Sequence, residues 1–338
     1  MPAPIVLTGI TGYIAKHIAL LLLEAGHSVR GSLRSQSRAD EVRAALRPQL
    51  SDPSLLERLS FVELDLTRDD GWTEALQGAS ALMHTASPFP LVQPKDPQLA
   101  IGPAVEGTKR ALNAAAEAGV TRVVLTSSVV AIAYGQEPRG TPFTEADWTN
   151  TDAPGLTPYT LSKTLAERAA WDMASTHNLD LTTINPGLVV GAPLDPDIGT
   201  SLEVLTRLMR STDPMLPQIG FSCVDVVDVA RLHLNALADD ATIGQRIIAA
   251  ERYLSFSDTA RLVQDALPDR RITTREAPNV LVRFLGLFDP TIRTILGDLG
   301  KRREAASDRA AALLGRPLRD ARDSVRETAA RLSDMGLA

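Results

Sequence analysis

The feature that most constrains the fold is a glycine-containing turn between the first apolar run and the first helical stretch. Pro4 to Leu7 is typical of a strand, and Tyr13 to Ala25 is apolar at helical spacing. The sequence TGITGYIA at 8–15 joins them. In this context Gly9 permits a tight turn and Gly12 lets the backbone approach a pyrophosphate at the helix N-terminus, which is typical of dinucleotide binding. The alternative is a turn that contains two glycines by chance.

Strand-like and helix-like runs continue to alternate over the first two hundred residues. Apolar strand-like runs occupy 28–33, 59–64, 81–85, 122–127 and 181–185, and helix-like runs occupy 40–46, 72–76, 105–118 and 158–175. Continuous apolar strands separated by helices indicate a parallel sheet that is covered on both faces. We therefore expect an α/β fold, a Rossmann-type doubly wound parallel sheet with a smaller, mostly helical C-terminal substrate region.

The alternation loosens after residue 187, where prolines interrupt the chain. We expect residues 1–186 to form the dinucleotide-binding Rossmann domain, with a returning segment at about 222–250. Residues 187–221 and 251–338 are then expected to form the substrate-binding region. The charge-rich stretch 301–331 is interpreted as a solvated helical face.

Composition and charge exclude several classes of function. The net charge of −6 provides no basic field for nucleic acid. Cys223 is the only cysteine and the five histidines are scattered, so we expect no disulfide and no metal site. The N-terminus has neither a cationic leader nor an apolar run near the ~20 residues of a membrane span. We expect a cytoplasmic monomer or homodimer that binds no membrane.

The end of the second strand-like run distinguishes two dinucleotides. An acidic residue there would accept hydrogen bonds from the ribose hydroxyls of NAD. The chain instead carries Arg34, with Arg30 and Arg38 nearby and no acid before Asp40. Because a guanidinium is a permanent cation whose donors suit a phosphate, we expect NADP(H) as the cofactor. The alternative is a solvated basic loop.

Tyr159 and Lys163 form a Y-x-x-x-K motif that places a phenol and an ammonium on one helical face. A phenol of pKa about 10 is a poor acid–base group at neutral pH, and a nearby cation favours its ionised form. Ser128 follows the fifth strand, at the edge where parallel sheets bind ligands, so its hydroxyl is placed to hold a carbonyl oxygen. The alternatives are a chance surface motif and ordinary strand-end capping.

Together these motifs resemble the extended short-chain dehydrogenase/reductases, especially the branch of dihydroflavonol reductases and fungal or yeast aldehyde and ketone reductases. The resemblance covers essentially the full length. It rests on TGITGYIA, VRGSLRS, HTAS at 84–87, VVLTSS at 123–128, YTLSKTLAERAAW at 159–171 and NPGLVVGAP at 185–193. It implies an NADPH-dependent carbonyl reductase that also runs in reverse as an alcohol dehydrogenase.

The resemblance also implies roles for individual residues. Ser128, Tyr159 and Lys163 look like the catalytic triad, and Arg34 looks like the residue that binds the 2′-phosphate. The cofactor contacts that we expect are Gly9, Thr11, Gly12, Tyr13, Ile14, Arg34, Asp65, Leu66, Thr85, Ala86, Ser87, Tyr159, Lys163, Pro186, Val189 and Ser201. Two departures stand out, since Ala104 replaces an Asn of many extended members and Arg38 lies near the place of a lysine that is frequent in the branch.

The loops that follow the strands favour an apolar substrate. Candidate wall residues are mostly uncharged: 89–92, Ile132, Tyr134, Leu188, Val190, 215–217, Ile219 and Phe221. A pocket for a sugar nucleotide would need convergent cations, whereas Lys95 and Arg139 are the main ones here. We therefore expect a small-molecule carbonyl or alcohol substrate, hydrophobic or aromatic, with Tyr159 as the proton donor. The alternatives are a nucleotide-sugar epimerase or dehydratase, a hydroxysteroid-type dehydrogenase and a non-catalytic NADP-sensing protein.

Overall fold

The fold is organised around a seven-stranded parallel sheet. The computed structural model describes residues 2–87 and 96–338. The sheet has the order β3-β2-β1-β4-β5-β6-β9, and every neighbouring pair is parallel. Its strands are β1 (Ile5–Thr8), β2 (Val29–Leu33), β3 (Leu59–Glu63), β4 (Ala81–His84), β5 (Arg122–Thr126), β6 (Asp180–Pro186) and β9 (Arg246–Ala249). The expected doubly wound α/β sheet is confirmed.

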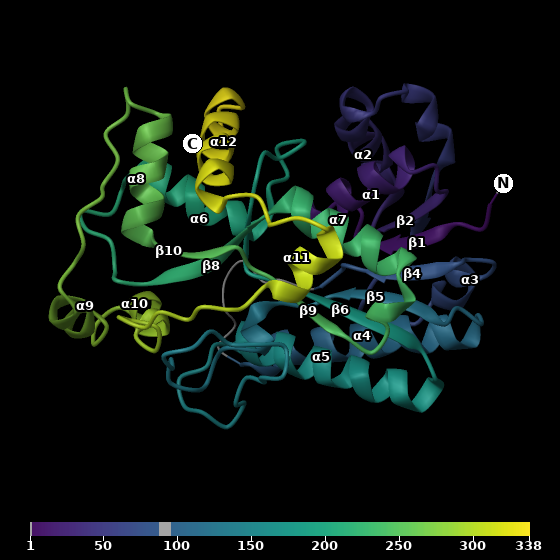
Figure 1. Ribbon diagram of the computed structural model, residues 1–338, viewed down its shortest axis with the longest axis horizontal. Helices are drawn as coiled ribbons and strands as arrows, with labels where there is room; N and C mark the ends of the chain where they lie inside the picture. The colour runs from purple at the N-terminus through teal and green to yellow at the C-terminus, as the bar shows by residue number, and fades with distance from the viewer. Residues whose placement is uncertain (1, 88–95) are drawn as a thin grey trace.

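Helices cover both faces of this sheet (Figure 1). One face carries α1 (Tyr13–Glu24), α2 (Ala39–Leu46), α7 (Val226–Ala238) and α11 (Asp308–Leu314), and the other carries α3 (Trp72–Leu76), α4 (Gln98–Glu117) and α5 (Pro158–His177). Successive strand side chains point to opposite faces. Accordingly Ile5 and Leu7 pack against the first set of helices, whereas Val6 packs against the second. A sheet buried on both sides thus explains the continuous apolar strands.

Helix α4 begins at Gln98, seven residues before the expected start at Val105. The difference arises from Pro103, which lies inside the helix. A proline lacks the N–H that would bond to the carbonyl four residues earlier, so its presence argues against a helix on sequence grounds.

Short 3-10 helices connect several of these elements. They are η1 (Gln36–Arg38), η2 (Arg47–Gln49), η3 (Pro53–Arg58), η4 (Val129–Ala131) and η5 (Asp240–Thr242).

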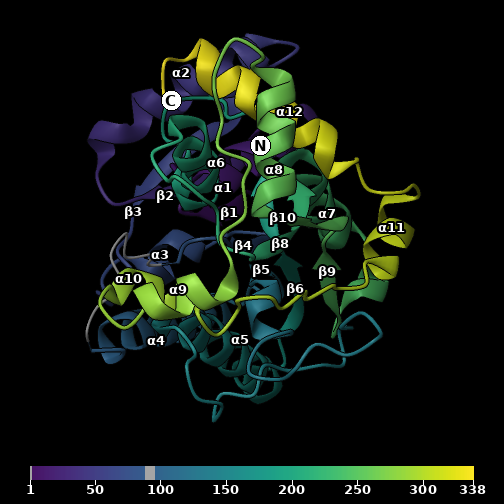
Figure 2. The same cartoon turned by 90° about the vertical axis from the view of Figure 1, so that its left-hand side faces the viewer.

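The C-terminal region contains a second, three-stranded sheet in the order β10-β8-β7. These strands are β7 (Leu188–Val190), β8 (Gly220–Asp225) and β10 (Arg252–Ser255). Their length of three to six residues explains why the sequence predicted a mostly helical region. Helices α6 (Gly199–Arg210), α8 (Phe256–Ala266) and α12 (Ala321–Asp334) group beside them, and α9 (Asn279–Leu285) and α10 (Pro290–Ile295) lie farther out (Figure 2). Across residues 2–87 and 96–338, no helix has the length and apolar content to cross a bilayer.

The charge-rich stretch near the C-terminus has a buried face, contrary to its interpretation as a solvated helix. Four apolar side chains of α12 are fully buried: Ala321, Val325, Ala329 and Leu332. They recur every three or four residues and pack with β7, β8 and α8. Small alanines among many charges give a weak apolar signal, which explains the wrong interpretation.

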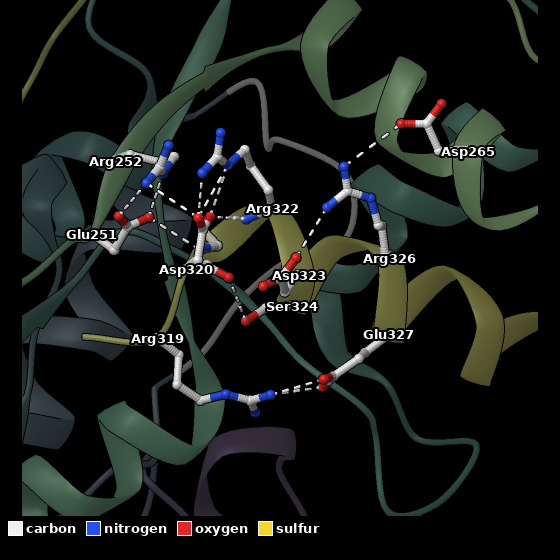
Figure 3. Close-up of polar contacts among 11 residues, drawn as sticks. Glu251, Arg252, Asp265, Arg319, Asp320, Arg322, Asp323, Ser324, Arg326 and Glu327 are labelled. Atoms are coloured by element: carbon white, nitrogen blue, oxygen red, sulfur yellow. Dashed lines mark hydrogen bonds and ion pairs between the residues drawn. The ribbon is translucent and has the colours of Figure 1, made fainter. Parts of the chain in front are cut away.

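Ion pairs join this segment to Arg252 of β10 and Asp265 of α8, as Figure 3 shows, and further ion pairs join it to β8 and α7. Asp225 at the end of β8 is fully buried, and it accepts a hydrogen bond from Ser324 at 2.6 Å and an ion pair from Arg319 at 3.1 Å. Arg319 also contacts Glu327 at 2.8 Å. Burial raises the pKa of Asp225 despite these partners. Arg316 pairs with the equally buried Asp228 at 2.6 Å. The C-terminal segment therefore neutralises two interior carboxylates.

Candidate active site

The candidate site lies at the carboxyl edge of the parallel sheet, where β1 has β2 on one side and β4 on the other. The strand order reverses at this point, and ligands of open α/β sheets bind outside it. Three chain segments meet there, namely Thr8–Gly9 after β1, His84–Ala86 after β4 and Thr126–Ser128 after β5. The glycine turn and the proposed catalytic serine thus share one edge.

The glycine turn has the geometry that a pyrophosphate requires. Gly9 has a φ of +66°, and a Cβ there would lie 3.0 Å from the Cα of Ala86, so both conformation and space demand glycine. Gly12 is the N-cap of α1 and supplies no side-chain cap. The N–H groups of the first helical turn are therefore left for an anion, which fits the phosphates of a dinucleotide.

Thr8 and His84 tie this turn to the end of β4. The Thr8 hydroxyl accepts hydrogen bonds from the N–H groups of Thr85 and Ala86, both at 3.1 Å, and lies 2.9 Å from Nδ1 of His84. Since its single proton must then go to His84, the proton of the neutral imidazole sits on Nε2. Burial and the charge of Lys163 lower the pKa of His84 to about 3. Nε2 is buried and has no hydrogen-bond partner among the described residues.

Two expected cofactor residues turn their side chains inward. The Tyr13 hydroxyl donates to the carbonyl oxygen of Gly191 at 2.8 Å, and burial raises the pKa of this phenol. Ile14 packs against the core of the α1 face. Consequently the side chain of Tyr13 is occupied within the protein, while Ile14 and Thr11 are half-buried.

The three arginines around β2 have different surroundings. Arg30 donates to the carbonyl oxygens of Ala75 at 2.6 Å and Gln77 at 3.1 Å. Arg38 pairs with Glu41 at 2.9 Å and Asp197 at 2.7 Å. Arg34 is exposed directly after β2, and its charge helps to lower the pKa of Asp65. Arg34 is thus the best placed of the three to bind an additional phosphate.

Asp65 and Leu66 follow β3 next to this arginine. The Asp65 carboxylate accepts hydrogen bonds from the N–H and the hydroxyl of Thr67 at 2.8 and 2.7 Å, and these bonds are the main cause of its lowered pKa. Leu66 lies against Gly107 of α4, where an added Cβ would come within 3.1 Å. The arrangement fixes both residues beside the carboxyl edge of β2.

Tyr159 and Lys163 lie one turn apart on α5, and Ser128 follows β5. A side-chain hydrogen bond joins Ser128 to Tyr159, and the Ser128 hydroxyl also lies 3.4 Å from the carbonyl oxygen of Pro186. Burial raises the pKa of Tyr159, and the Ser128 hydrogen bond opposes that shift. Burial lowers the pKa of Lys163 to about 8, and the charge of Glu167 acts against it. The upward shift for Tyr159 differs from the expected lowering by Lys163.

The remaining expected cofactor residues, among them Thr85, Ser87, Val189 and Ser201, have different environments. Thr85 donates to the carbonyl oxygen of Thr8 at 2.5 Å, and Ser87 is the last described residue before the gap at 88–95. Val189 is buried in the core, and Ser201 lies in the first turn of α6. The structure thus brings Thr85 to the glycine turn and turns the side chain of Val189 away from solvent.

Several expected wall residues of the substrate pocket are core residues instead. Val190 and Leu216 pack in the core beside α12, Ile219 packs near α9, and Ile132 is fully buried beside β9. Residues 89–92 and Lys95 lie outside the described residues. Partly buried candidates remain, namely Tyr134, Leu188, Met215 and Phe221.

Sequence reasoning missed two sets of polar residues. Arg303, which is 10% exposed, lies over the ring of Tyr134 at 4.7 Å and pairs with Asp298 at 2.6 Å. It was included in the stretch interpreted as solvated. The second set centres on Glu167, whose spacing of four residues from Lys163 was the available signal.

Comparisons with known proteins agree with this geometry. The model of the NAD dependent epimerase/dehydratase family matches residues 5–249. A cinnamoyl-CoA reductase of Medicago truncatula is 34% identical over 275 residues, covering 78% of this chain and 81% of the relative. A dihydroflavonol 4-reductase of Hordeum vulgare is 30% identical over 287 residues, covering 81% and 78%. The structure of methylglyoxal/isovaleraldehyde reductase Gre2 from yeast, complexed with NADPH, superimposes with a TM-score of 0.82 at 26% identity, covering 99% of this chain and 100% of that one.

Proposed function

Because the chain belongs to the NAD dependent epimerase/dehydratase family, and is an NAD(P)-dependent reductase of the extended short-chain dehydrogenase/reductase group, we propose that it reduces hydrophobic or aromatic aldehydes and ketones with NADPH. The observation that carries the proposal is the Ser128–Tyr159 hydrogen bond, with Lys163 one helical turn away, at the edge that holds the glycine turn. The names of the relatives support a carbonyl substrate, since they are reductases of cinnamoyl-CoA, dihydroflavonol and methylglyoxal or isovaleraldehyde.

The residues present fit NADPH. The N–H groups after Gly12 would hold the pyrophosphate, Arg34 the 2′-phosphate, and Lys163 the ribose next to the nicotinamide. When bound, NADPH supplies the hydride. These assignments account for why Gly9 and Gly12 open the turn and why an exposed cation follows β2.

The chain's own residues would then manage the carbonyl oxygen and the proton. Ser128 donates a hydrogen bond to the oxygen, and Tyr159 gives it the phenolic proton as negative charge develops. Burial raises the pKa of Tyr159, so the phenol is protonated at neutral pH, as a proton donor must be. The charged Lys163 stabilises the phenolate that remains.

A steady-state assay tests the proposal. We expect NADPH oxidation with aryl and branched aliphatic aldehydes and ketones, with kcat/KM that rises with apolar bulk. Tyr159→Phe should lower kcat by about 10²-fold or more and leave NADPH binding nearly unchanged, because it removes only the proton donor. Highest activity with a nucleotide sugar, or a Phe variant that keeps a tenth of the wild-type kcat, would contradict the proposal.

A further inference from the structure

We propose that Glu167 is a positioning residue of this site: its buried carboxylate anchors the chain at Ser128 and places a negative charge one helical turn from the Lys163 ammonium. The inference rests on the proposed function, because it concerns the same Ser128, Tyr159 and Lys163. Glu167 lies on α5 one turn after Lys163, and its side chain has no exposed surface.

One carboxylate oxygen of Glu167 reaches the segment that carries Ser128. Oε2 accepts hydrogen bonds from the Ser127 hydroxyl at 2.5 Å and from Nδ2 of Asn185 at 2.7 Å. The same Nδ2 donates to the carbonyl oxygen of Ser128 at 3.2 Å. Glu167 therefore connects α5, which presents Tyr159 and Lys163, with the ends of β5 and β6, where Ser128 lies.

The other oxygen is bound by donors from three further residues. Oε1 accepts from Nε of Arg246 at 2.7 Å, and from Trp171 and Thr183 at 3.3 Å each. Arg246 itself donates to three carbonyl oxygens and lies 3.8 Å above the centre of the Trp148 ring. A buried charge is retained only when it is paired and hydrogen-bonded, and Glu167 meets both conditions.

The charges around Lys163 give this carboxylate an electrostatic effect. His84 faces Lys163 from β4 and is neutral, Tyr159 lies one turn earlier on α5, and Arg246 lies beyond Glu167 on β9. Within residues 2–87 and 96–338, Glu167 is thus the anion that opposes the effect of burial on Lys163, whose pKa is about 8. A lysine is charged below its pKa, so activity that needs the ammonium falls as the pH rises through about 8. Removing the carboxylate moves that fall to lower pH.

Two substitutions in the same ion pair should shift the apparent pKa of Lys163 in opposite directions. Glu167→Gln removes the anion and should lower the apparent pKa of Lys163 by at least about half a unit. Arg246→Gln removes the cation behind the anion and should raise it. Both variants break the same buried ion pair, so structural damage alone would shift the apparent pKa of Lys163 in the same direction in both variants, or in neither.

The apparent pKa of Lys163 is measured on the protein without cofactor, from the pH dependence of acylation by acetic anhydride followed by peptide mass spectrometry. The exposed Lys109 is the internal control and should not change between variants. The alkaline limb of kcat for carbonyl reduction is measured in parallel and should move in the same direction. If Glu167→Gln does not fold, Glu167→Asp, which keeps the charge and the wild-type limb, is compared with Arg246→Gln.

Shifts of the same sign in Glu167→Gln and Arg246→Gln, or unchanged values in both, overturn the inference. The inference is also overturned if Glu167→Asp shifts the alkaline limb of kcat in the same direction and to the same extent as Arg246→Gln. The acylation readout separates this result from a failure of the proposed function. An inactive wild type with the expected opposite shifts contradicts the proposed reaction alone, whereas an active wild type without them contradicts only the role of Glu167.

Discussion

Replacing Arg34 with alanine should weaken NADPH binding about tenfold and leave NADH binding almost unchanged. A hydrogen bond to a charged group contributes roughly 1.5–3 kcal/mol. Arg34 is exposed, so solvent screens the contact and the lower value applies, which corresponds to about a factor of ten in Kd. NADH lacks the phosphate, and its affinity should therefore change by less than about twofold.

The assay is fluorescence titration of both nucleotides, and the neighbouring arginines are its controls. Arg30→Ala removes donors to the carbonyl oxygens of Ala75 and Gln77, so it should lower stability without separating the two nucleotides. Titrations at increasing ionic strength should reduce the Arg34 effect. Equal losses of affinity for NADPH and NADH in Arg34→Ala would refute the assignment.

Two stability predictions follow from the packing, each measured by urea denaturation. Leu332→Ala should lower the free energy of unfolding by about 2–5 kcal/mol, because Leu332 is fully buried. Leu287→Ala, at a position that is 67% exposed, should change it by less than about 0.5 kcal/mol. Equal effects of the two substitutions would contradict the placement of α12. Gly187→Ala should cost at least about 3 kcal/mol, since its Cβ would lie 1.9 Å from the carbonyl oxygen of Ser222. Gly140→Ala, whose Cβ would meet no atom within 4 Å, should change the free energy of unfolding by less than about 1 kcal/mol. A tolerated Gly187→Ala would show that β6 and β8 are farther apart.

The parts of the fold that the sequence predicted depend on local patterns. Alternating strand and helix periods, the turn at Gly9 and Gly12, and the spacing of Tyr159 and Lys163 are each visible within a short window, and the parallel sheet follows from them. The motifs that follow strands could be placed at one sheet edge because all carboxyl ends meet there.

The parts that were missed depend on contacts between distant residues. Glu167 meets Arg246 across 79 positions of sequence, and no local spacing announces that partner. Arg303 stands among charged residues and was taken for one more exposed cation, yet it is 10% exposed beside Tyr134. The buried stripe of α12 is partly alanine, whose small side chain gives little periodic signal. Long-range pairing, rather than composition, decides the environment of such residues.

The ion pairs of Asp225 and Asp228 with Arg319 and Arg316 bear on the order in which the chain folds during its synthesis. Both carboxylates lie where β8 meets α7, and α7 packs beside α1 on the first face of the sheet. Their cationic partners are made about ninety residues later, after most of the sheet has left the ribosome. Until then, closing this face would bury two unpaired charges, which is strongly unfavourable. This face of the sheet is therefore completed only after residues 316 and 319 have been made, and a nascent chain that stops before them would keep it open.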